Sequence, residues 1–125
     1  MLPGAVGRTF AAGATTFQEV SIRDTECKGL WRCSDAAEAL AGALVELRLA
    51  ACVNLLPGAR SVYRWQGAVE RAEETLLIAK TTQARYAELE AEVRRRHPYE
   101  LPELLAVHLA CGFHPYLQWV HDSTA

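Results

Sequence analysis

The stretch Ala50–Thr81, AACVNLLPGARSVYRWQGAVERAEETLLIAKT, decides the fold of this chain. In residues 61–66 the side chains alternate, with Tyr63 and Trp65 on one predicted face, and a period of two is typical of a strand. The chain then turns at Gln66-Gly67, and residues 76–79 are apolar without alternation, which favours a strand covered on both faces. The sequence therefore predicts a long β-hairpin.

Such a hairpin exposes more edge and more apolar face than a chain of 125 residues can easily cover. Partner subunits are therefore expected to cover the remainder. Pro57-Gly58 lies inside the first hairpin strand and predicts a bend or bulge rather than the end of that strand.

The length predicts one domain, over residues 17–125, after a mobile N-terminal tail over residues 1–16 that is rich in Gly, Ala and Thr. The 13 basic and 15 acidic residues leave a formal net charge of -2, which gives no electrostatic case for nucleic acid as a partner. No apolar run approaches the roughly 20 residues that span a bilayer, and the N-terminus does not resemble a signal peptide. We expect no membrane association and a cytoplasmic location.

The four cysteines are Cys27, Cys33, Cys52 and Cys111. They form no CxxC pair and match no structural zinc spacing, so reduced thiols in a cytosolic protein are expected. Two interpretations of His108, Cys111 and His114 stay open: soft metal ligands, or a strand that ends in a glycine turn with surface histidines.

Helical periodicity appears on both sides of the hairpin. Ser34 is a favourable N-cap for a helix to about Arg48, whose apolar stripe contains Leu40, Leu44 and Leu47. A second helix follows Thr81 or Thr82, either of which could cap it, and ends at His97-Pro98. Its apolar stripe comprises Tyr86, Leu89 and Val93.

The remaining elements complete the order. The first strand falls either at residues 17–22 or at residues 28–33, residues 103–109 form a further strand with two apolar faces, and Pro115 opens a short helix. The order predicts an α+β fold of the split βαβ, ferredoxin-like kind, an antiparallel sheet with helices on one face.

No catalytic motif such as GxSxG, a Walker loop or HExxH occurs, and the candidate site rests on single residues. His97, beside Tyr99 and Glu100, could be a general acid or base, a metal ligand, or a hydrogen-bonded core histidine. Tyr63 and Trp65 could line a small-molecule pocket or a subunit interface.

Lys80 and Trp119 extend the list of candidate residues. Lys80 interrupts an apolar strand, so an inward orientation would require Glu74, Glu100 or Glu103 as its partner, whereas a lysine at a strand end could also reach solvent. Trp119, in the last helix beside Tyr116, is expected to anchor an interface rather than to bind a ligand.

Four runs of sequence closely resemble the CutA family of divalent-cation tolerance proteins over roughly residues 35–124. They are ALVELRLAACVNLLPGARSVYRWQGAVE, ETLLIAKT, RRHPYELPELLAV and PYLQWV. The resemblance implies a ferredoxin-like fold that assembles as a tight homotrimer, in which the long hairpins of neighbouring subunits pair edge to edge. It also implies a role in tolerance of copper and other divalent cations.

The resemblance further implies a metal site and a ligand pocket. The resemblance implies that copper is bound by a thiol in the first strand together with the histidine of the HPY motif. His97 matches that histidine, Arg96 stands where some members have a second one, and Cys33 and Cys27 flank the expected thiol position. The pocket expected near a subunit boundary comprises Tyr63, Trp65, Lys80, His97, Tyr99, Glu100 and Trp119.

Two other functions stay open. The trimer could be a non-catalytic assembly or signalling module that presents surfaces to a protein partner or a small ligand. The chain could also be an enzyme that uses His97 and Glu100 as acid and base.

Overall fold

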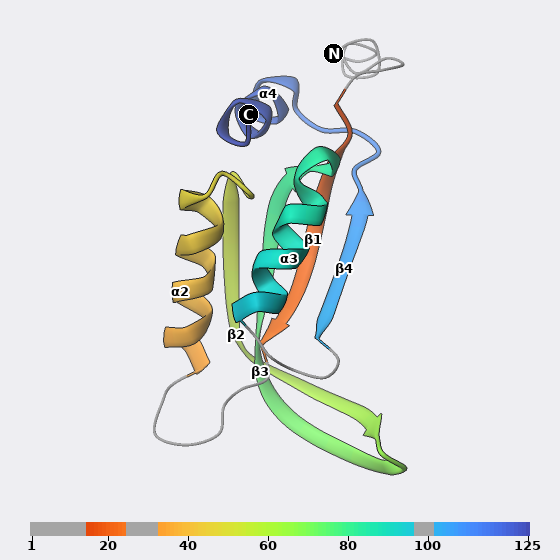
Figure 1. Ribbon diagram of the computed structural model, residues 1–125. Helices are drawn as coiled ribbons and strands as arrows, with labels where there is room; N and C mark the ends of the chain where they lie inside the picture. Colours follow the sequence, from red (N-terminus) through yellow and green to blue (C-terminus); the bar gives the residue numbers. More distant parts are fainter. Residues whose placement is uncertain (1–14, 25–32, 97–101) are drawn as a thin grey trace.

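The computed structural model describes residues 15–24, 33–96 and 102–125, which form a four-stranded sheet and three α-helices (Figure 1). The expected N-terminal tail therefore lies almost wholly outside the described residues. The elements in chain order are β1 (Phe17–Asp24), α2 (Cys33–Glu46), β2 (Cys52–Trp65), β3 (Ala68–Thr82), the short 3₁₀ helix η1 (Gln83–Arg85), α3 (Tyr86–Arg96), β4 (Glu103–His108) and α4 (His114–Ser123).

The sheet has the strand order β2-β3-β1-β4, and each neighbouring pair is antiparallel. Helices α2 and α3 lie over one face, and α4 crosses the end of the sheet near the start of β1 (Figure 1). The main core forms between that face and the two helices, with Val20, Ile22, Leu77 and Leu89 at most 1% exposed. The α+β split βαβ architecture predicted from the element order is confirmed.

The first strand is residues 17–24, so the first of the two predicted alternatives holds. β1 lies in the middle of the sheet, between β3 and β4, and its alternate residues Val20 and Ile22 enter the core. The opposite residues, such as Glu19 and Arg23, therefore lie on the face away from α2 and α3, which we call the open face.

Helix α2 ends two residues earlier than its hydrophobic stripe indicated. Leu40 and Leu44 are buried as predicted, but Leu47 is 51% exposed. Arg48 adopts a left-handed conformation with φ 61°, and this turn brings Leu49 rather than Leu47 into the core. The prediction for Leu47 was wrong because the helix had already ended, so the helical period no longer applied.

The hairpin forms as predicted. β2 and β3 pair from Cys52↔Lys80 to Trp65↔Ala68, and the register shifts between Leu56 and Ala59, where Pro57-Gly58 forms the expected bulge. Gln66 and Gly67 connect the strands with φ 49° and 82°, and two consecutive positive φ values are typical of a type I′ hairpin turn. The tip of the hairpin projects well beyond both helices (Figure 1).

Neither threonine caps the second helix through its side chain. Thr82 precedes η1 without a side-chain cap hydrogen bond, and the hydroxyl of Thr81 donates to the carbonyl oxygen of Leu49 at 2.6 Å. The capping prediction was wrong because β3 continues through both residues, which directs the Thr81 side chain into the fold.

Strand β4 is covered on one face only. Leu104 packs against the core, whereas Leu105 and Val107 on the open face are 62% and 59% exposed. The predicted second apolar face of this strand is therefore exposed in the single chain. No described helix has the length and apolarity that crossing a membrane would require.

Candidate functional site

The open face of the sheet carries most of the predicted site residues that the structure describes. Direct cross-strand partners point to the same side of a sheet, so the pairs Lys80↔Glu19 and Lys80↔Cys52 place these three residues together on the open face. The same alternation places Tyr63 and Trp65 on the continuation of that face along the hairpin. Both aromatic side chains are half-buried.

At one end of the open face lies an arginine between two glutamates. Arg23 Nε is 2.8 Å from Glu74 Oε2, and Arg23 Nη1 is 3.2 Å from Glu103 Oε1. The ring of Tyr63 lies over the guanidinium group, with 5.2 Å between the ring centroid and Cζ. We refer to these four residues as the Arg23 cluster.

At the other end, Lys80 is held by polar neighbours. Its ammonium group donates a hydrogen bond to Asn54 Oδ1 and lies 4.0 Å from Glu19 Oε2. Glu74 and Glu103, two of the partners predicted for Lys80, instead pair with Arg23. That prediction was wrong because the register places Glu19, and not either of these glutamates, opposite Lys80.

Helix α4 adds an aromatic pair close to this end. Tyr116 and Trp119 have ring centroids 5.5 Å apart, and both residues are more than 40% exposed. Burial raises the pKa of the Tyr116 hydroxyl, and the nearby Cys52 thiol and Glu19 carboxylate raise that pKa further. The role of Trp119 as an interface anchor stays a prediction.

The predicted pocket residues that the structure describes do not form one cluster within a single chain. Tyr63 pairs with Glu70, whereas Lys80 pairs with Cys52, so eleven residues of β2 separate the two positions. At about 3.3 Å per residue this corresponds to roughly 35 Å along a strand. His97, Tyr99 and Glu100 lie outside the described residues. Tyr63 instead lies with Arg23 at one end of the open face, and Lys80 lies at the other end.

Cys33 is the first residue of α2 and does not belong to a strand. The first strand, β1, has the sequence FQEVSIRD and contains no cysteine. In the described part of the chain, no three His, Cys, Asp or Glu side chains lie close enough to hold a metal ion. His108, Cys111 and His114 therefore do not form a ligand set.

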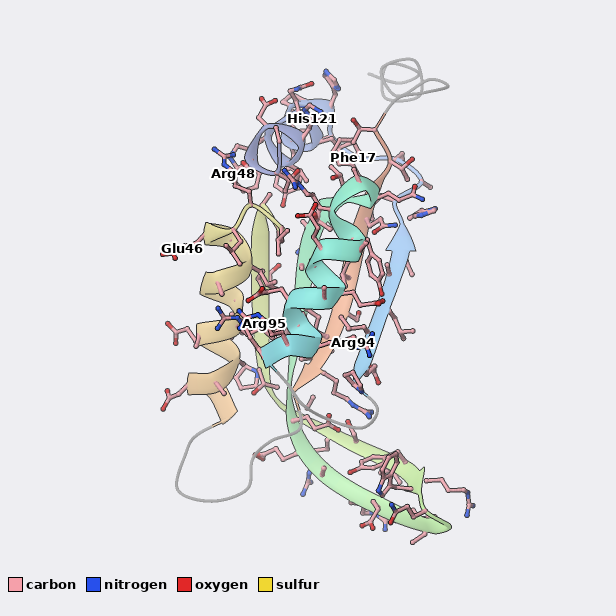
Figure 2. The ribbon with its side chains drawn as sticks, viewed as in Figure 1. Phe17, Glu46, Arg48, Arg94, Arg95 and His121 are labelled. Carbon is pink, nitrogen blue, oxygen red and sulfur yellow. The ribbon has the colours of Figure 1, made fainter. Side chains whose placement is uncertain are left out.

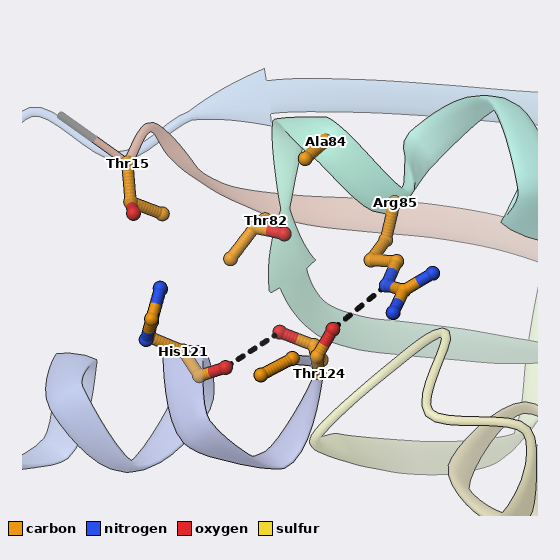
Figure 3. Close-up of a pocket in the computed structure, with 7 residues that line it drawn as sticks. Thr15, Thr82, Ala84, Arg85, His121 and Thr124 are labelled. Carbon is orange, nitrogen blue, oxygen red and sulfur yellow. Dashed lines mark hydrogen bonds between the residues drawn. The ribbon is translucent and has the colours of Figure 1, made fainter. Parts of the chain in front are cut away.

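A shallow pocket of about 280 Å³ lies between β3, η1 and the C-terminus (Figure 3). Arg85 Nε donates to the carbonyl oxygen of Thr124 at 2.7 Å, and the Thr124 hydroxyl donates to the carbonyl oxygens of Val120 and His121. Arg48 reaches the carbonyl oxygens of Asp122 and Ser123 from the other side (Figure 2). These polar groups hold the end of α4, and no motif in the sequence indicated this pocket.

Comparison with known proteins decides the family. The family model described as CutA1 divalent ion tolerance protein matches residues 31–123. The chain belongs to the CutA1 family.

CutA relatives come from bacteria and from eukaryotes. The divalent-cation tolerance protein CutA of Thermus thermophilus is 47% identical over 90 residues, which cover 72% of this chain and 87% of that protein. The human protein CutA is 46% identical over 88 residues, which cover 70% of this chain and 49% of that protein. The chain thus spans about half the length of the human relative.

Solved CutA structures share the fold. The divalent cation tolerance protein from Thermus thermophilus superposes with a TM-score of 0.78 at 40% identity, covering 87% of this chain and 99% of that chain. CutA1 from Oryza sativa superposes with a TM-score of 0.78 at 34% identity, covering 88% and 94% of the two chains. Both the resemblance to the family and the predicted fold are confirmed.

Proposed function

We propose that this CutA1 family member acts as a cytoplasmic homotrimer that binds a divalent cation, with copper as the first candidate, and so contributes to metal tolerance. The observation that supports assembly is the open face. Leu56, Leu105 and Val107 are 45%, 62% and 59% exposed there, and β2 and β4 are the edge strands of the sheet that the described residues form. Apolar side chains beside free strand edges favour association with further copies.

Assembly would also bring separated site residues together. The hairpin projects beyond its own helices (Figure 1), so its half-buried Tyr63 and Trp65 are available to a neighbouring chain. The ligand pocket that we propose, formed by Tyr63, Trp65, Lys80, His97, Tyr99, Glu100 and Trp119, would lie at such a boundary. A second chain would supply the residues that one chain keeps apart, since Tyr63 lies with Arg23 at one end of the open face and Lys80 lies at the other.

Sizing of the purified protein tests the assembly. We expect a particle of three times the 13.8 kDa chain mass in sedimentation velocity at micromolar concentration. Val107→Arg should shift the particle to a monomer, because a buried unpaired guanidinium on the open face would oppose association. Val45→Arg is the matched control, since Val45 is exposed on α2 and lies away from the open face. A wild-type monomer or dimer would overturn the trimer.

The cation part rests on family membership and on His97. The described residues do not fit a complete metal site, because they contain no suitable cluster and β1 has no thiol. His97 would thus have to act with ligands from outside the described residues or from other copies of the chain.

Copper titration by calorimetry tests the role of His97. His97→Ala should weaken copper binding by about tenfold or more, the size expected when one contributor to a metal site is lost. His108→Ala, which removes an exposed histidine of β4, should leave the isotherm unchanged. Identical isotherms for wild type and His97→Ala would remove His97 from the site.

The exposed aromatic pair Tyr116 and Trp119 on α4 favours a second candidate, a trimer whose surfaces bind a protein partner without any cation. A trimer that shows no copper binding in the calorimetric titration would support this second candidate and not the copper-binding one.

A further inference from the structure

Arg23 connects all four strands of the sheet through one guanidinium group. It belongs to β1, and its partners Tyr63, Glu74 and Glu103 belong to β2, β3 and β4. Each of these strands is already paired to a neighbour through its backbone. The Arg23 cluster adds a side-chain link between strands that are not neighbours in the sheet, since β2 does not pair with β1.

The Arg23 cluster lies where the hairpin separates from the rest of the sheet. The β1 ladder on β3 ends with the pair Asp24↔Thr75, so Glu74 is the first residue of β3 beyond that ladder. Glu74 pairs with Ala59, which immediately follows the bulge in β2. On the tip side of this junction, backbone pairing among the described residues joins β2 only to β3, so the described ladder does not fix the direction of the hairpin.

The contact between Tyr63 and Arg23 requires a bend at this junction. Along β3, the cross-strand partner of Tyr63 is Glu70 and that of Arg23 is Leu76. Six residues separate these partners, which is about 20 Å along a straight strand. The ring nevertheless lies 5.2 Å from Cζ of Arg23, so the hairpin curls toward the open face. Figure 1 shows the hairpin turning away from the axis of the sheet below the helices.

Because Glu74 is buried, the stability of the Arg23 cluster depends on the position of the Arg23 guanidinium group. The Glu74 side chain is fully buried, and neither of its oxygens accepts an aligned hydrogen bond from the described residues. Its negative charge therefore depends on the close guanidinium group of Arg23 for compensation. The face of the Tyr63 ring attracts the same cation, and this attraction weakens if the hairpin straightens.

We infer that the Arg23 cluster is a clamp that fixes the direction of the hairpin and so prepares the hairpin to engage a second copy of this chain. The effect of the clamp on association rests on the proposed assembly. Its effect on the direction of the hairpin is a property of one chain. A hairpin that is already fixed loses less conformational entropy when the chains associate, so the free energy of association is more favourable. Loss of the clamp should thus weaken assembly. The variant at Arg23 and Glu74 tests this without changing Tyr63, which the proposed pocket places at the subunit boundary.

The test compares three variants in two backgrounds. Tyr63→Leu removes the ring, Tyr63→Phe retains it as the matched control, and the double variant Arg23→Met/Glu74→Met removes both charges without leaving one unpaired. Hydrogen–deuterium exchange of the hairpin amides is measured in the Val107→Arg background, and dissociation of the assembly is measured in the native background. The first measurement reports on the single chain and the second on its association.

We expect Tyr63→Leu and the double variant to raise exchange of residues 59–73 by about tenfold while the core strand amides keep their protection. In the native background the same variants should raise the dissociation constant by about tenfold or more. Tyr63→Phe should match the parent in both measurements. If Tyr63→Leu matches Tyr63→Phe in hairpin exchange, the clamp is overturned. If the parent is itself monomeric, the proposed assembly fails, and the exchange measurement still decides the clamp.

Discussion

At the scale of single residues, the end of α3 shows how local charge acts on one carboxylate. Glu92 pairs with Arg95 and Arg96, and Arg96 Nε donates to Glu92 Oε2 at 2.6 Å. The hydrogen bond from Arg95, followed by that from Arg96, holds the pKa of the Glu92 carboxyl below its ordinary value of 4.5. Both arginines also lie in the last helical turn, where the helix dipole favours cations.

A pH dependence follows from the direction of this shift. Because the folded pKa lies below the unfolded one, the ionised Glu92 stabilises the fold above about pH 4.5, and this contribution is lost as the pH falls through the folded pKa. We expect Glu92→Gln to lower the melting temperature at neutral pH and to approach wild type at acidic pH, as the Glu92 carboxyl becomes protonated in the folded protein. Thermal melts of Glu92→Gln and of the exposed-site control Glu38→Gln across this range check it. An equal effect at both pH values would contradict the assignment.

At the scale of elements, a change from glycine to alanine should have opposite effects on stability in a strand bulge and in a helix. Gly58, at the bulge of β2, has φ +80°, and a Cβ placed there meets no atom within 4 Å. Gly42 lies inside α2, and a Cβ placed there also meets no atom within 4 Å. Backbone conformation alone therefore separates the two positions.

We expect Gly58→Ala to destabilise the protein by about 1–2 kcal/mol, because the added Cβ is strained in a left-handed conformation. Gly42→Ala should stabilise it by about 0.5–1 kcal/mol, because alanine restricts the unfolded chain and suits a helix interior. Urea unfolding of both variants measures the two changes in the free energy of unfolding. The same sign for both would show that packing, and not backbone conformation, controls these sites.

At the scale of the whole molecule, one face of the sheet is buried under α2 and α3, whereas the open face exposes apolar side chains to solvent. The face beneath α2 and α3 holds the main core, whose residues are almost fully buried. The open face combines exposed Leu105 and Val107 with charged residues that are already paired within the chain, such as Arg23 and Lys80. This combination suits an interface, because association would bury apolar area without leaving these charges unpaired. The predicted effect of Val107→Arg on particle mass depends on this property of the whole face.

The sequence by itself determined the elements and their order, except for the first strand, for which two segments stayed open. Period-two alternation in residues 61–66, Gln66-Gly67 and Pro57-Gly58 predicted the hairpin, its turn and its bulge, because each feature depends on local backbone preference. The same holds for the buried positions Leu40, Leu44, Leu89 and Val93 of the helices. The four family motifs were specific enough to indicate the family before any comparison.

Only the tertiary structure decided which side chains meet. The partner of Lys80 depends on the register between β1 and β3, and the contact of Arg23 with Tyr63 depends on the bend of the hairpin. Likewise, Leu47 is exposed because a left-handed residue at Arg48 redirects the chain. Local sequence carries the periodicity of each element, whereas register, bend and pairing of charges arise from contacts between residues that are distant along the chain.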